Sequence, residues 1–579
     1  MYDRAGQLLK DFIGHSGGVR GITATADGTY LASGGEDQTI ILWKMAETGA
    51  APSMRQELPE WSDFFSSLPI DSLTKDPSKK AWKAVIDFLK VNREKKVLGF
   101  IEEVYKNLGE EVHPFATLFV TEDFEWVCWT PKGYFTCTSS GSQYFGWHVN
   151  RGINKLADFY AAEQYFEILF RPKQMQKMIA QGKRIEEILL EEGERLFDLG
   201  RLHTPSAGFI EVRNLINNSD VQYKEGKLVT AKTALTLDVE VFDGGGGVRE
   251  VNIYQNDKLI LTDRDYKTKQ GERVEKQYKV DLLNETNEFK VVVKNYQKME
   301  SRPEILKIDY VGQVIATSAL HIMAVGINNY KNGAYNLNYA QPDAKSFVDQ
   351  IATNYDKIFK SVNKVEIYNE DATKDNIIEG FNKIIAKARP EDVFVFFYAG
   401  HGSLDEEHKD ADGESPFYFV PTDVTKIYGD PEQLQKKGLS ANELKSYLTQ
   451  IRSTKQVVLM DACHSGGALK TLNVRAAGSD EKAIFQLARS SGVVTIASAG
   501  SKQFATEFEV LKHGVFTYVL LEALNGKADG NADGKVTISE IKIYLEERVP
   551  ELTKQYGGTA QYPTSYVTGN DFPLSILQK

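Results

Sequence analysis

The sequence predicts a multidomain protein whose C-terminal part has an α/β fold, a mostly parallel central sheet flanked by helices, preceded by β-rich domains. Three observations support this. The chain has 579 residues, and a single domain usually has ~100–200, so several domains are expected. From residue 316 onward, apolar runs alternate with helical patterns, which is typical of a parallel sheet. Earlier parts contain short alternating runs separated by turn residues, which favour antiparallel sheets.

Composition and charge narrow the function classes. Hydrophobic residues make up 42% of the chain and charged residues 26%, which is ordinary for globular proteins and excludes wholesale disorder. Acidic residues (80) outnumber lysine and arginine (69), so the formal net charge is −11. An acidic chain repels the phosphates of nucleic acids. We therefore expect no nucleic-acid partner and favour a basic substrate.

Cysteine usage and hydropathy predict a cytoplasmic location. The chain has three cysteines, Cys128, Cys137 and Cys463. This sparse, odd number does not provide a disulfide framework and suits a reducing compartment. The first residues lack a basic segment followed by an apolar stretch, and no window approaches ~18 apolar residues. Neither a signal peptide nor a membrane partner is expected.

Residues 1–45 contain one repeat-like unit. Gly14-His15 opens it, Asp27-Gly28 marks a turn, and its last apolar run ends at Trp43. These features resemble a blade of a WD40 propeller. One blade cannot bury its faces alone, so the unit either belongs to a longer propeller or packs on another part of the chain. An isolated antiparallel meander is the alternative. The resemblance implies that the N-terminal region binds a protein partner.

Residues 46–204 are expected to mix helices and strands. Helical spacing of apolar residues extends over 46–113 and again over 155–200. Between Phe115 and Cys137 short apolar runs predict strands, whose aromatic residues we interpret as sheet core rather than a ligand cage.

Residues 205–312 alternate in short β-like runs whose spacing predicts a small β-sandwich of immunoglobulin type. Four consecutive glycines, Gly244 to Gly247, separate two of these runs. No Lys-Ser/Thr pair and no helix follow them, which favours a flexible hairpin loop over a phosphate-binding loop. The α/β domain is expected over residues 316–579.

Two apolar strands of that α/β domain each deliver one reactive side chain just beyond their carboxyl ends. His401 follows Val393–Tyr398, and Cys463 follows Val457–Met460. Ligands bind at this edge of such sheets, and a thiol needs a neighbouring base, usually histidine, to be a nucleophile near neutral pH. We predict His401 as general base and Cys463 as nucleophile. The N–H groups of Gly402 and Cys463 are candidates for an oxyanion hole.

Each of the two side chains alone has a simpler interpretation. A histidine after a strand is more often structural, and a lone cysteine is usually a small core residue. Their joint occurrence at glycine-flanked strand ends of one domain favours the catalytic dyad. His464, adjacent to the nucleophile, would point the opposite way on an extended segment and is interpreted as structural.

Residues 316–579 resemble a caspase-like cysteine peptidase of clan CD, family C14, and more specifically the metacaspase and bacterial orthocaspase branch. Three ordered motifs carry the resemblance. Asn338–Ala344 matches the early motif that ends in Asp-Ala, Tyr398–Gly402 the His-Gly motif, and Asp461–Gly466 the Asp-x-Cys-x-Ser-Gly motif. The resemblance covers less than half of the chain. It implies an endopeptidase that uses a Cys-His dyad for acyl transfer through a thioester, with no cofactor required for the chemistry.

The same resemblance implies the specificity. Apoptotic caspases, which cleave after aspartate, have an arginine after the nucleophile, whereas here none follows Cys463 and Asp461 precedes it. In the metacaspase branch the residues matching Asp343 and Asp461 line an acidic S1 pocket. Arg or Lys is therefore expected at P1, bound by charge-assisted hydrogen bonds. Asp343 could instead be the N-cap of a helix extending to Ile351. Ala399 departs from the family, which often has serine there, and this bears on one polar S1 contact.

A polar segment, Ala468–Ser491, separates the nucleophile strand from the next strand. It contains four basic residues: Lys470, Arg475, Lys482 and Arg489. In the family, maturation cuts fall in this segment, so a basic-specific enzyme is expected to process itself here. A solvated surface loop is the alternative.

A calcium loop is expected near the C-terminus. Asp529–Glu540 fits D-x-[DN]-x-[DN]-G-x5-E at every fixed position, with Gly534 at the sharp turn. The expected ligands are Asp529, Asn531, Asp533, the Lys535 carbonyl, Thr537 directly or through water, and bidentate Glu540. The alternative is an Asp/Gly turn in which Thr537 or Ser539 caps the last helix.

Together these features predict a cytoplasmic cysteine endopeptidase that cleaves protein or peptide substrates after Arg or Lys, modulated by calcium and self-processing. Two other function classes stay open: an interaction scaffold whose caspase-like domain is inactive or latent, and a calcium-responsive adaptor.

Overall fold

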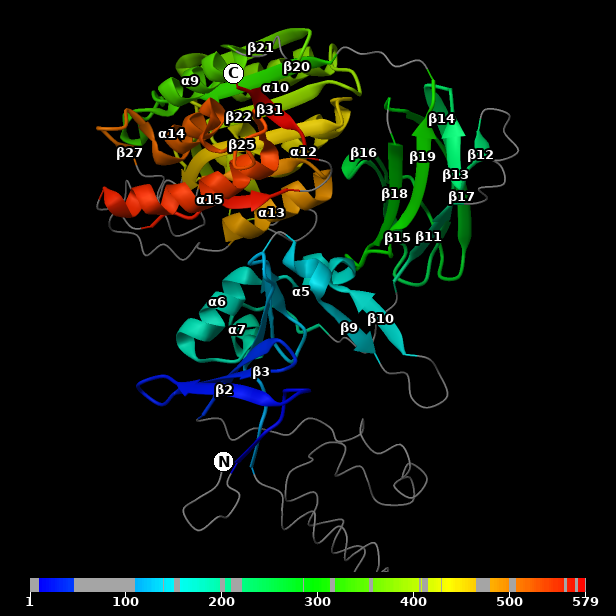
Figure 1. Cartoon of the computed structure of the whole chain (residues 1–579), viewed down its shortest axis with the longest axis vertical. Coiled ribbons are helices and arrows are strands. Elements are labelled where there is room, and N and C mark those ends of the chain that lie inside the picture. The colour runs from blue at the N-terminus through cyan, green and yellow to red at the C-terminus, as the bar shows by residue number, and fades with distance from the viewer. Residues whose placement is uncertain are drawn as a thin grey trace, which may run out of the picture. The chain divides into compact units, whose positions relative to one another are not determined.

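The structure of the chain is a computed structural model (Figure 1). It describes residues 10–45, 110–138, 140–149, 157–197, 204–209, 221–284, 286–312, 318–353, 358–405, 408, 415–427, 430–464, 479–498, 507–556, 560–567 and 571–577. The chain divides into two compact units, the first of residues 1–163 with 169–201 and the second of residues 164–168 with 202–579. Within the described segments, every helix is too short or too polar to span a bilayer. The helices expected between residues 46 and 109 lie outside the described residues.

A six-stranded antiparallel sheet is the centre of the first unit. Its strands, in spatial order, are β2 (Val19–Ala24), β3 (Tyr30–Gly35), β4 (Thr39–Lys44), β6 (Ala116–Val120), β7 (Trp126–Trp129) and β8 (Phe135–Cys137). The first three are the strands of the repeat-like unit, and the last three are those expected between Phe115 and Cys137. Pairing of β4 with β6 joins the two groups. The repeat-like unit therefore does pair with another part of the chain.

A buried hydrogen-bond network connects the two ends of the repeat-like unit. His15 Nε2 lies 2.8 Å from Ser33 Oγ, and His15 Nδ1 lies 3.0 Å from Asp37 Oδ1. Trp43 Nε1 donates to the same Ser33 hydroxyl at 2.8 Å. A Cβ added to Gly14 would come within 2.8 Å of the Trp43 ring. His15 and Trp43, which the sequence analysis singled out, thus both form hydrogen bonds with the Ser33 hydroxyl, because buried ring nitrogens need hydrogen-bond partners.

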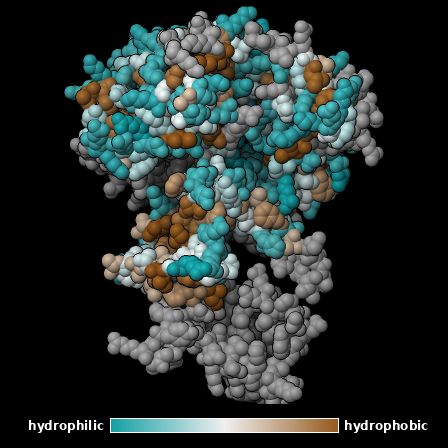
Figure 2. Space-filling model, in the orientation of Figure 1, coloured by the Kyte–Doolittle hydropathy of each residue, from teal (hydrophilic) through white to brown (hydrophobic). Residues whose placement is uncertain are grey.

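The edge of this sheet is uncovered by the described residues. Every residue of β2 is exposed, including Val19 at 56% and Ile22 at 67%. Figure 2 shows apolar colour gathered more densely over the first unit than over the second. This agrees with the expectation that one blade cannot bury its faces alone.

The other elements of the first unit are short. They are β1 (Lys10–Phe12), β5 (Glu110–Val112), β9 (Gly146–Val149), β10 (Asp158–Ala161), α6 (Pro172–Gln181) and α7 (Ile185–Glu191); α5 (Phe166–Leu169) crosses into the second unit. Two predictions of helix were wrong: residues 110–112 and 158–161 are strands. The physical reason is pairing, since β5 pairs in parallel with β1 and β10 pairs with β9, and such partners override local spacing.

The β-rich part of the second unit consists of two sheets. One contains β11 (Ser206–Phe209), β14 (Ala234–Phe242) and β17 (Arg273–Asp281). The other has the order β12 (Gln222–Lys224), β13 (Lys227–Thr230), β19 (Glu304–Tyr310), β18 (Thr286–Asn295), β15 (Val248–Gln255) and β16 (Lys258–Asp263). Alternate residues of β14 and β15, such as Leu237 and Ile253, are buried in one shared core. The immunoglobulin type of this arrangement stays a prediction.

The glycine run Gly244 to Gly247 is not a hairpin loop, contrary to expectation. It connects β14 to β15, which belong to different sheets. Gly245, Gly246 and Gly247 have φ values of 140°, 86° and 72°, which other residues rarely adopt. Glycine is needed here because the chain must turn from one sheet to the other.

The central sheet of the second unit is mostly parallel, as predicted. Its order is β21 (Ser361–Tyr368), β20 (Ala319–Gly326), β22 (Val393–Leu404), β25 (Lys455–His464), β26 (Val494–Ala497) and β30 (Thr564–Tyr566). All neighbours pair in parallel except β26 with β30. Beyond its central part, β22 also pairs with β23 (Phe417–Phe419), which in turn pairs with β24 (Leu439–Ser440).

Helices cover both faces of this sheet (Figure 1). One face packs on α9 (Ala340–Thr353), α14 (Val515–Glu522) and α15 (Ile538–Gln555), and the other on α10 (Lys374–Ile385), α12 (Ala441–Gln450) and α13 (Ser479–Ser491). In β22, Val395 and Phe397 belong to the first core, whereas Phe394 and Phe396 belong to the second. Both faces are buried, which is why the strand reads as an unbroken apolar run. Near the sheet lie also α11 (Pro431–Lys437), β27 (Glu507–Phe508), β28 (His513–Gly514), β29 (Lys535–Thr537) and β31 (Pro573–Ile576).

Candidate active site

The central strands β22 and β25 bring the two predicted catalytic positions together. In their parallel register, Ala399 pairs with Asp461, and His401 pairs with Cys463. Paired positions of adjacent strands lie on the same face of a sheet. The backbone of Cys463 is described, whereas its side chain lies outside the described residues. The positions of the predicted dyad are therefore neighbours at the carboxyl edge of the sheet.

His401 is held by two tyrosines of the segment after β20. Its Nε2 lies 2.7 Å from the carbonyl oxygen of Tyr335, to which a protonated Nε2 donates. Its backbone N–H donates to the Tyr330 hydroxyl at 2.9 Å, and the Tyr330 ring lies 4.9 Å from the imidazole. The carbonyl of Tyr335 can only accept, so it selects the tautomer with the proton on Nε2. Nδ1 is then free to accept a proton.

Burial determines the charge of this histidine. His401 is 8% exposed, and burial lowers the pKa of its imidazole to about 4, against a smaller opposing effect of the hydrogen bond to Tyr335. The imidazole is therefore neutral near pH 7, which is the form a general base requires.

The two glycines beside His401 are needed because neighbouring side chains approach their Cα atoms closely. A Cβ on Gly400 would lie 2.9 Å from the Tyr330 hydroxyl oxygen, and one on Gly402 would lie 2.5 Å from the Phe417 ring. Larger residues would displace the tyrosine or the phenylalanine that pack around the histidine. The oxyanion role of the Gly402 and Cys463 N–H groups stays a prediction.

The two predicted specificity carboxylates converge on one glycine. A Cβ added to Gly514 would lie 2.9 Å from Asp461 Oδ2 and 3.1 Å from Asp343 Oδ2. Asp343 comes from α9 and is 3% exposed, whereas Asp461 comes from β25 and is 8% exposed. Any larger residue at Gly514 would intrude between these oxygens. The fold thus brings to one place two acids, 118 positions apart, that the sequence analysis singled out, and their role in substrate binding stays a prediction.

Each carboxylate has its own hydrogen-bond partner. Asp343 Oδ1 lies 2.5 Å from His513 Nδ1, and Asp343 Oδ2 accepts the Gly514 N–H at 3.1 Å. Asp461 Oδ2 accepts the Thr517 hydroxyl at 2.6 Å. Burial raises the pKa of Asp343 to about 7; the His513 hydrogen bond opposes this rise, and repulsion from Asp461 adds to it. Two acids in one buried place repel each other and attract a cation.

This geometry settles one alternative. Asp343 is not the N-cap of its helix, because α9 begins at Ala340 and the Asp343 side chain binds His513 and Gly514 instead. Ala399 is 1% exposed and belongs to the core on the α9 face.

Known families match two parts of the chain. The caspase domain family matches residues 320–572, the same stretch that contains the paired strands and the acidic pair. Residues 320–572 form a caspase domain. The WD domain, G-beta repeat family matches residues 6–44, which contain the His15–Ser33–Trp43 network.

Relatives of the caspase domain include two metacaspases. The chain is 27% identical over 160 residues to metacaspase-1 of Plasmodium falciparum, covering 25% of this chain and 24% of that protein. It is 33% identical over 105 residues to metacaspase-1 of Meyerozyma guilliermondii, covering 17% of this chain and 23% of that protein. The chain thus spans about a quarter of the length of these relatives. Separately, 49 residues are 41% identical to nuclear distribution protein PAC1-1 of Uncinocarpus reesii, covering 8% of this chain and 11% of that protein.

Several site residues of the caspase domain were missed in the sequence. They are Tyr330, Tyr335, His513, Gly514 and Thr517. The sequence offered one signal for three of them. Thr517 is a polar residue within an apolar helix, and His513 and Gly514 come directly before that helix. The tyrosines gave no signal, because a carbonyl oxygen that orients an imidazole can belong to any residue type.

The expected processing segment of the caspase domain is not one loop. Residues 479–491 form helix α13, so the alternative interpretation, a solvated surface loop up to Ser491, was wrong for this part of the segment. Arg489 is part of this helix and forms two hydrogen bonds with Glu300, of 3.1 and 2.7 Å. A side chain so paired is not presented for cleavage. Lys470 and Arg475, and the Lys482 side chain, lie outside the described residues.

The calcium-loop residues are engaged by the loop's own backbone. Asp529 Oδ2 accepts the Gly534 N–H at 3.0 Å, and Asp533 Oδ1 accepts the Lys535 N–H at 2.8 Å. Glu540 accepts the Thr537 N–H at 3.0 Å, completing a capping box that begins α15. Among the described residues, no three His, Cys, Asp or Glu side chains are grouped to hold a metal ion. The oxygens suit calcium by type, and calcium binding stays a prediction.

Proposed function

We propose that the caspase domain is a cysteine endopeptidase with His401 as general base and Cys463 as nucleophile, selective for Arg or Lys at P1. The observation that carries this proposal is the convergence of Asp343 and Asp461 on Gly514, next to the register pair of His401 and Cys463. The caspase family match over residues 320–572 supports the reaction class.

The proposed reaction follows from the tautomer of the histidine. With Nε2–H bound to the Tyr335 carbonyl, Nδ1 of His401 takes the proton of the Cys463 thiol as sulfur attacks the substrate carbonyl carbon. The imidazolium then gives that proton to the leaving amine as the C–N bond breaks, leaving a thioester. Water hydrolyses the thioester, with His401 accepting its proton, and the free thiol returns. The N–H groups of Gly402 and Cys463 would bind the oxyanion.

The proposed specificity follows from charge. A basic P1 side chain would place its ammonium or guanidinium between two buried carboxylates that otherwise repel each other. Such charge-assisted hydrogen bonds are roughly twice as strong as neutral ones. An acidic P1 side chain would meet like charge and be rejected.

A fluorogenic peptide series tests this proposal. The full chain should cleave peptides with Arg or Lys at P1 and leave the matched Asp peptide intact, and Cys463→Ala should lower kcat by a factor of about 10³ or more. Cys128→Ala is the matched control, because burial raises the pKa of the Cys128 thiol to about 12 and makes it unreactive. A protein that a basic-P1 thiol probe does not label would refute the enzyme and favour a scaffold with an inactive domain.

The WD40 repeat favours a second role, in which the first unit binds a protein partner. Its edge strand β2 is exposed among the described residues. Removing residues 1–45 while retaining peptide cleavage would separate this partner-binding role from catalysis. Self-processing is tested by mass spectrometry for fragments ending at Lys470 or Arg475, with Cys463→Ala as the blank.

A further inference from the structure

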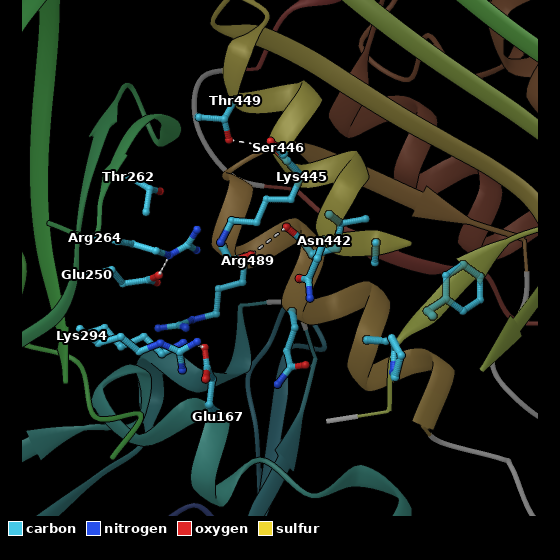
Figure 3. Close-up of a pocket in the computed structure, with 18 of the residues that line it drawn as sticks. Glu167, Glu250, Thr262, Arg264, Lys294, Asn442, Lys445, Ser446, Thr449 and Arg489 are labelled. Atoms are coloured by element: carbon cyan, nitrogen blue, oxygen red, sulfur yellow. Dashed lines mark hydrogen bonds and ion pairs between the residues drawn. The ribbon is translucent and has the colours of Figure 1, made fainter. Parts of the chain in front are cut away.

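A cavity of about 690 Å³ lies within the second unit, apart from the catalytic residues (Figure 3). Strands β15 and β16, the end of β18, helices α12 and α13, and the start of β23 supply its walls. Helices α12 and α13 cover the sheet face opposite to the one that carries Asp343. His401, Asp343 and Asp461 do not line the cavity, although Phe417, which packs beside Gly402, does.

Cations predominate in this cavity. The lining cations are Arg249, Arg264, Lys294, Lys445 and Arg489, and the lining carboxylates are Glu167 and Glu250. Adding Glu300, which binds Arg489, still leaves more positive than negative groups. We call this cavity the cationic pocket.

Most of these cations already have carboxylate partners. Arg489 binds Glu300 through two hydrogen bonds, and Lys294 forms an ion pair with Glu167. Arg264 Nε donates to Glu250 Oε2 at 2.9 Å, although its own side chain is largely exposed. These pairs hold the walls of the pocket in place.

Lys445 is different. It extends from α12 into the pocket, toward Arg264 and Glu250 (Figure 3). Within the described part of the chain, its ammonium makes no direct hydrogen bond or ion pair, and Glu250 acts on it only at longer range. Burial lowers the pKa of this lysine, which reflects the cost of an ammonium group without a partner. A half-buried cation that makes no direct ion pair among the described residues is suited to receive a counter-charge from a ligand.

We propose that the cationic pocket binds a small oxyanion with several phosphate or carboxylate groups, coordinated by Lys445 together with Arg264 and Arg489. Arginine forks and lysine ammonium groups donate to the oxygens of such groups. The pocket volume is in the range of small-molecule sites, and it is too large for a single inorganic ion. The inference is independent of the proposed peptidase function, because it concerns binding alone.

Calorimetric titration of the full chain tests the proposal. Tripolyphosphate, ATP and citrate are compared at constant ionic strength, so that general salt effects cancel. We expect one anion per chain, and an affinity on the order of ten-fold weaker or more in Lys445→Gln. Stronger binding of tripolyphosphate than citrate would identify phosphate as the preferred group, and the reverse would identify carboxylate.

Two controls separate binding from folding. Without ligand, Lys445→Gln should unfold at the same or a higher temperature than the unaltered protein, because it removes a half-buried charge that makes no direct ion pair within the described part of the chain. Lys383→Gln, on the exposed side of α10 where it pairs with Glu379, should bind the anion with unchanged affinity. The absence of stoichiometric binding for all three anions would overturn the proposal, as would undiminished binding in Lys445→Gln.

Discussion

The acidic pair and the cationic pocket are two regions of the same unit in which charged side chains of one sign gather. The acidic pair gathers carboxylates, whereas the cationic pocket gathers lysine and arginine side chains. Asp343 and Asp461 approach one glycine, and His513 lies beside Asp343. In the cationic pocket, Lys445 lies among cations whose carboxylates are already used. The ion pair of Arg489 with Glu300 joins opposite charges directly, whereas each of these two places gathers groups of like charge. This difference is the basis of both binding proposals.

The largest expected effect comes from breaking the acidic pair. Asp461→Ala should lower kcat/KM for an Arg-P1 peptide on the order of 100-fold, because one charge-assisted hydrogen bond to the substrate is lost. Its melting temperature should change little, since losing the Thr517 hydrogen bond is offset by relief of repulsion with Asp343. Peptide kinetics and thermal unfolding measure the two quantities. Equal cleavage of Asp-P1 and Arg-P1 peptides by the unaltered protein would show that the acidic pair does not select substrate.

The other carboxylate of the acidic pair, Asp343, predicts how the stability of the protein depends on pH. The pKa of Asp343 is raised from 3.8 to about 7 in the folded protein. The folded state therefore binds more protons than the unfolded state between these values, so stability falls as pH rises through this window. Asp343→Asn should remove this decrease in stability with rising pH. Its melting temperature should exceed that of the unaltered protein by a few degrees above pH 7 and match it near pH 4, while Arg-P1 turnover decreases. A melting-temperature difference independent of pH would contradict the assignment.

Lys258 extends the comparison to a buried cation whose partner among the described residues is a backbone carbonyl. It is 1% exposed, and its Nζ donates to the Ile451 carbonyl oxygen at 2.5 Å. Burial lowers its pKa from 10.5 to about 7, so the unfolded state binds more protons in that window and stability rises with pH. Lys258→Met should raise the melting temperature by a few degrees at or below pH 7, and the gain should shrink toward pH 10. Gln456 also donates to the Ile451 carbonyl, so the substitution leaves that oxygen with a partner. A gain that grows with pH would refute the account.

The smallest effect is expected at the calcium loop. Asp529 and Asp533 already accept backbone N–H groups, and Glu540 caps α15. Because these side chains are already engaged within the loop, we expect weak binding with a melting-temperature rise of about 1–3 °C at millimolar calcium. Glu540→Gln is the test variant and magnesium the matched control. A titration that changes neither melting temperature nor peptide turnover would end the proposal that calcium modulates the protein.

Parts of the fold and the candidate site residues could be predicted from the sequence because the patterns that indicate them lie within short segments of the chain. The unbroken apolar run at Val393–Tyr398 predicted a buried parallel strand, since both of its faces meet helices. His401, Asp461 and Asp343 were singled out because they stand in recognisable motifs. The strands at 110–112 and 158–161 were missed, because their pairing partners lie elsewhere in the chain. Gly514 was missed because its requirement arises only from oxygens contributed by distant elements.

Sequence by itself determined which residues are candidates for chemistry and predicted the alternation of strands and helices in the caspase domain. Only the tertiary structure decided how charges are balanced: that His513 partners Asp343, that Glu300 neutralises Arg489, and that no described carboxylate binds Lys445 directly. The physical reason is that residue type and spacing specify local structure and burial, whereas the electrostatic state of a buried group depends on whatever the fold places beside it.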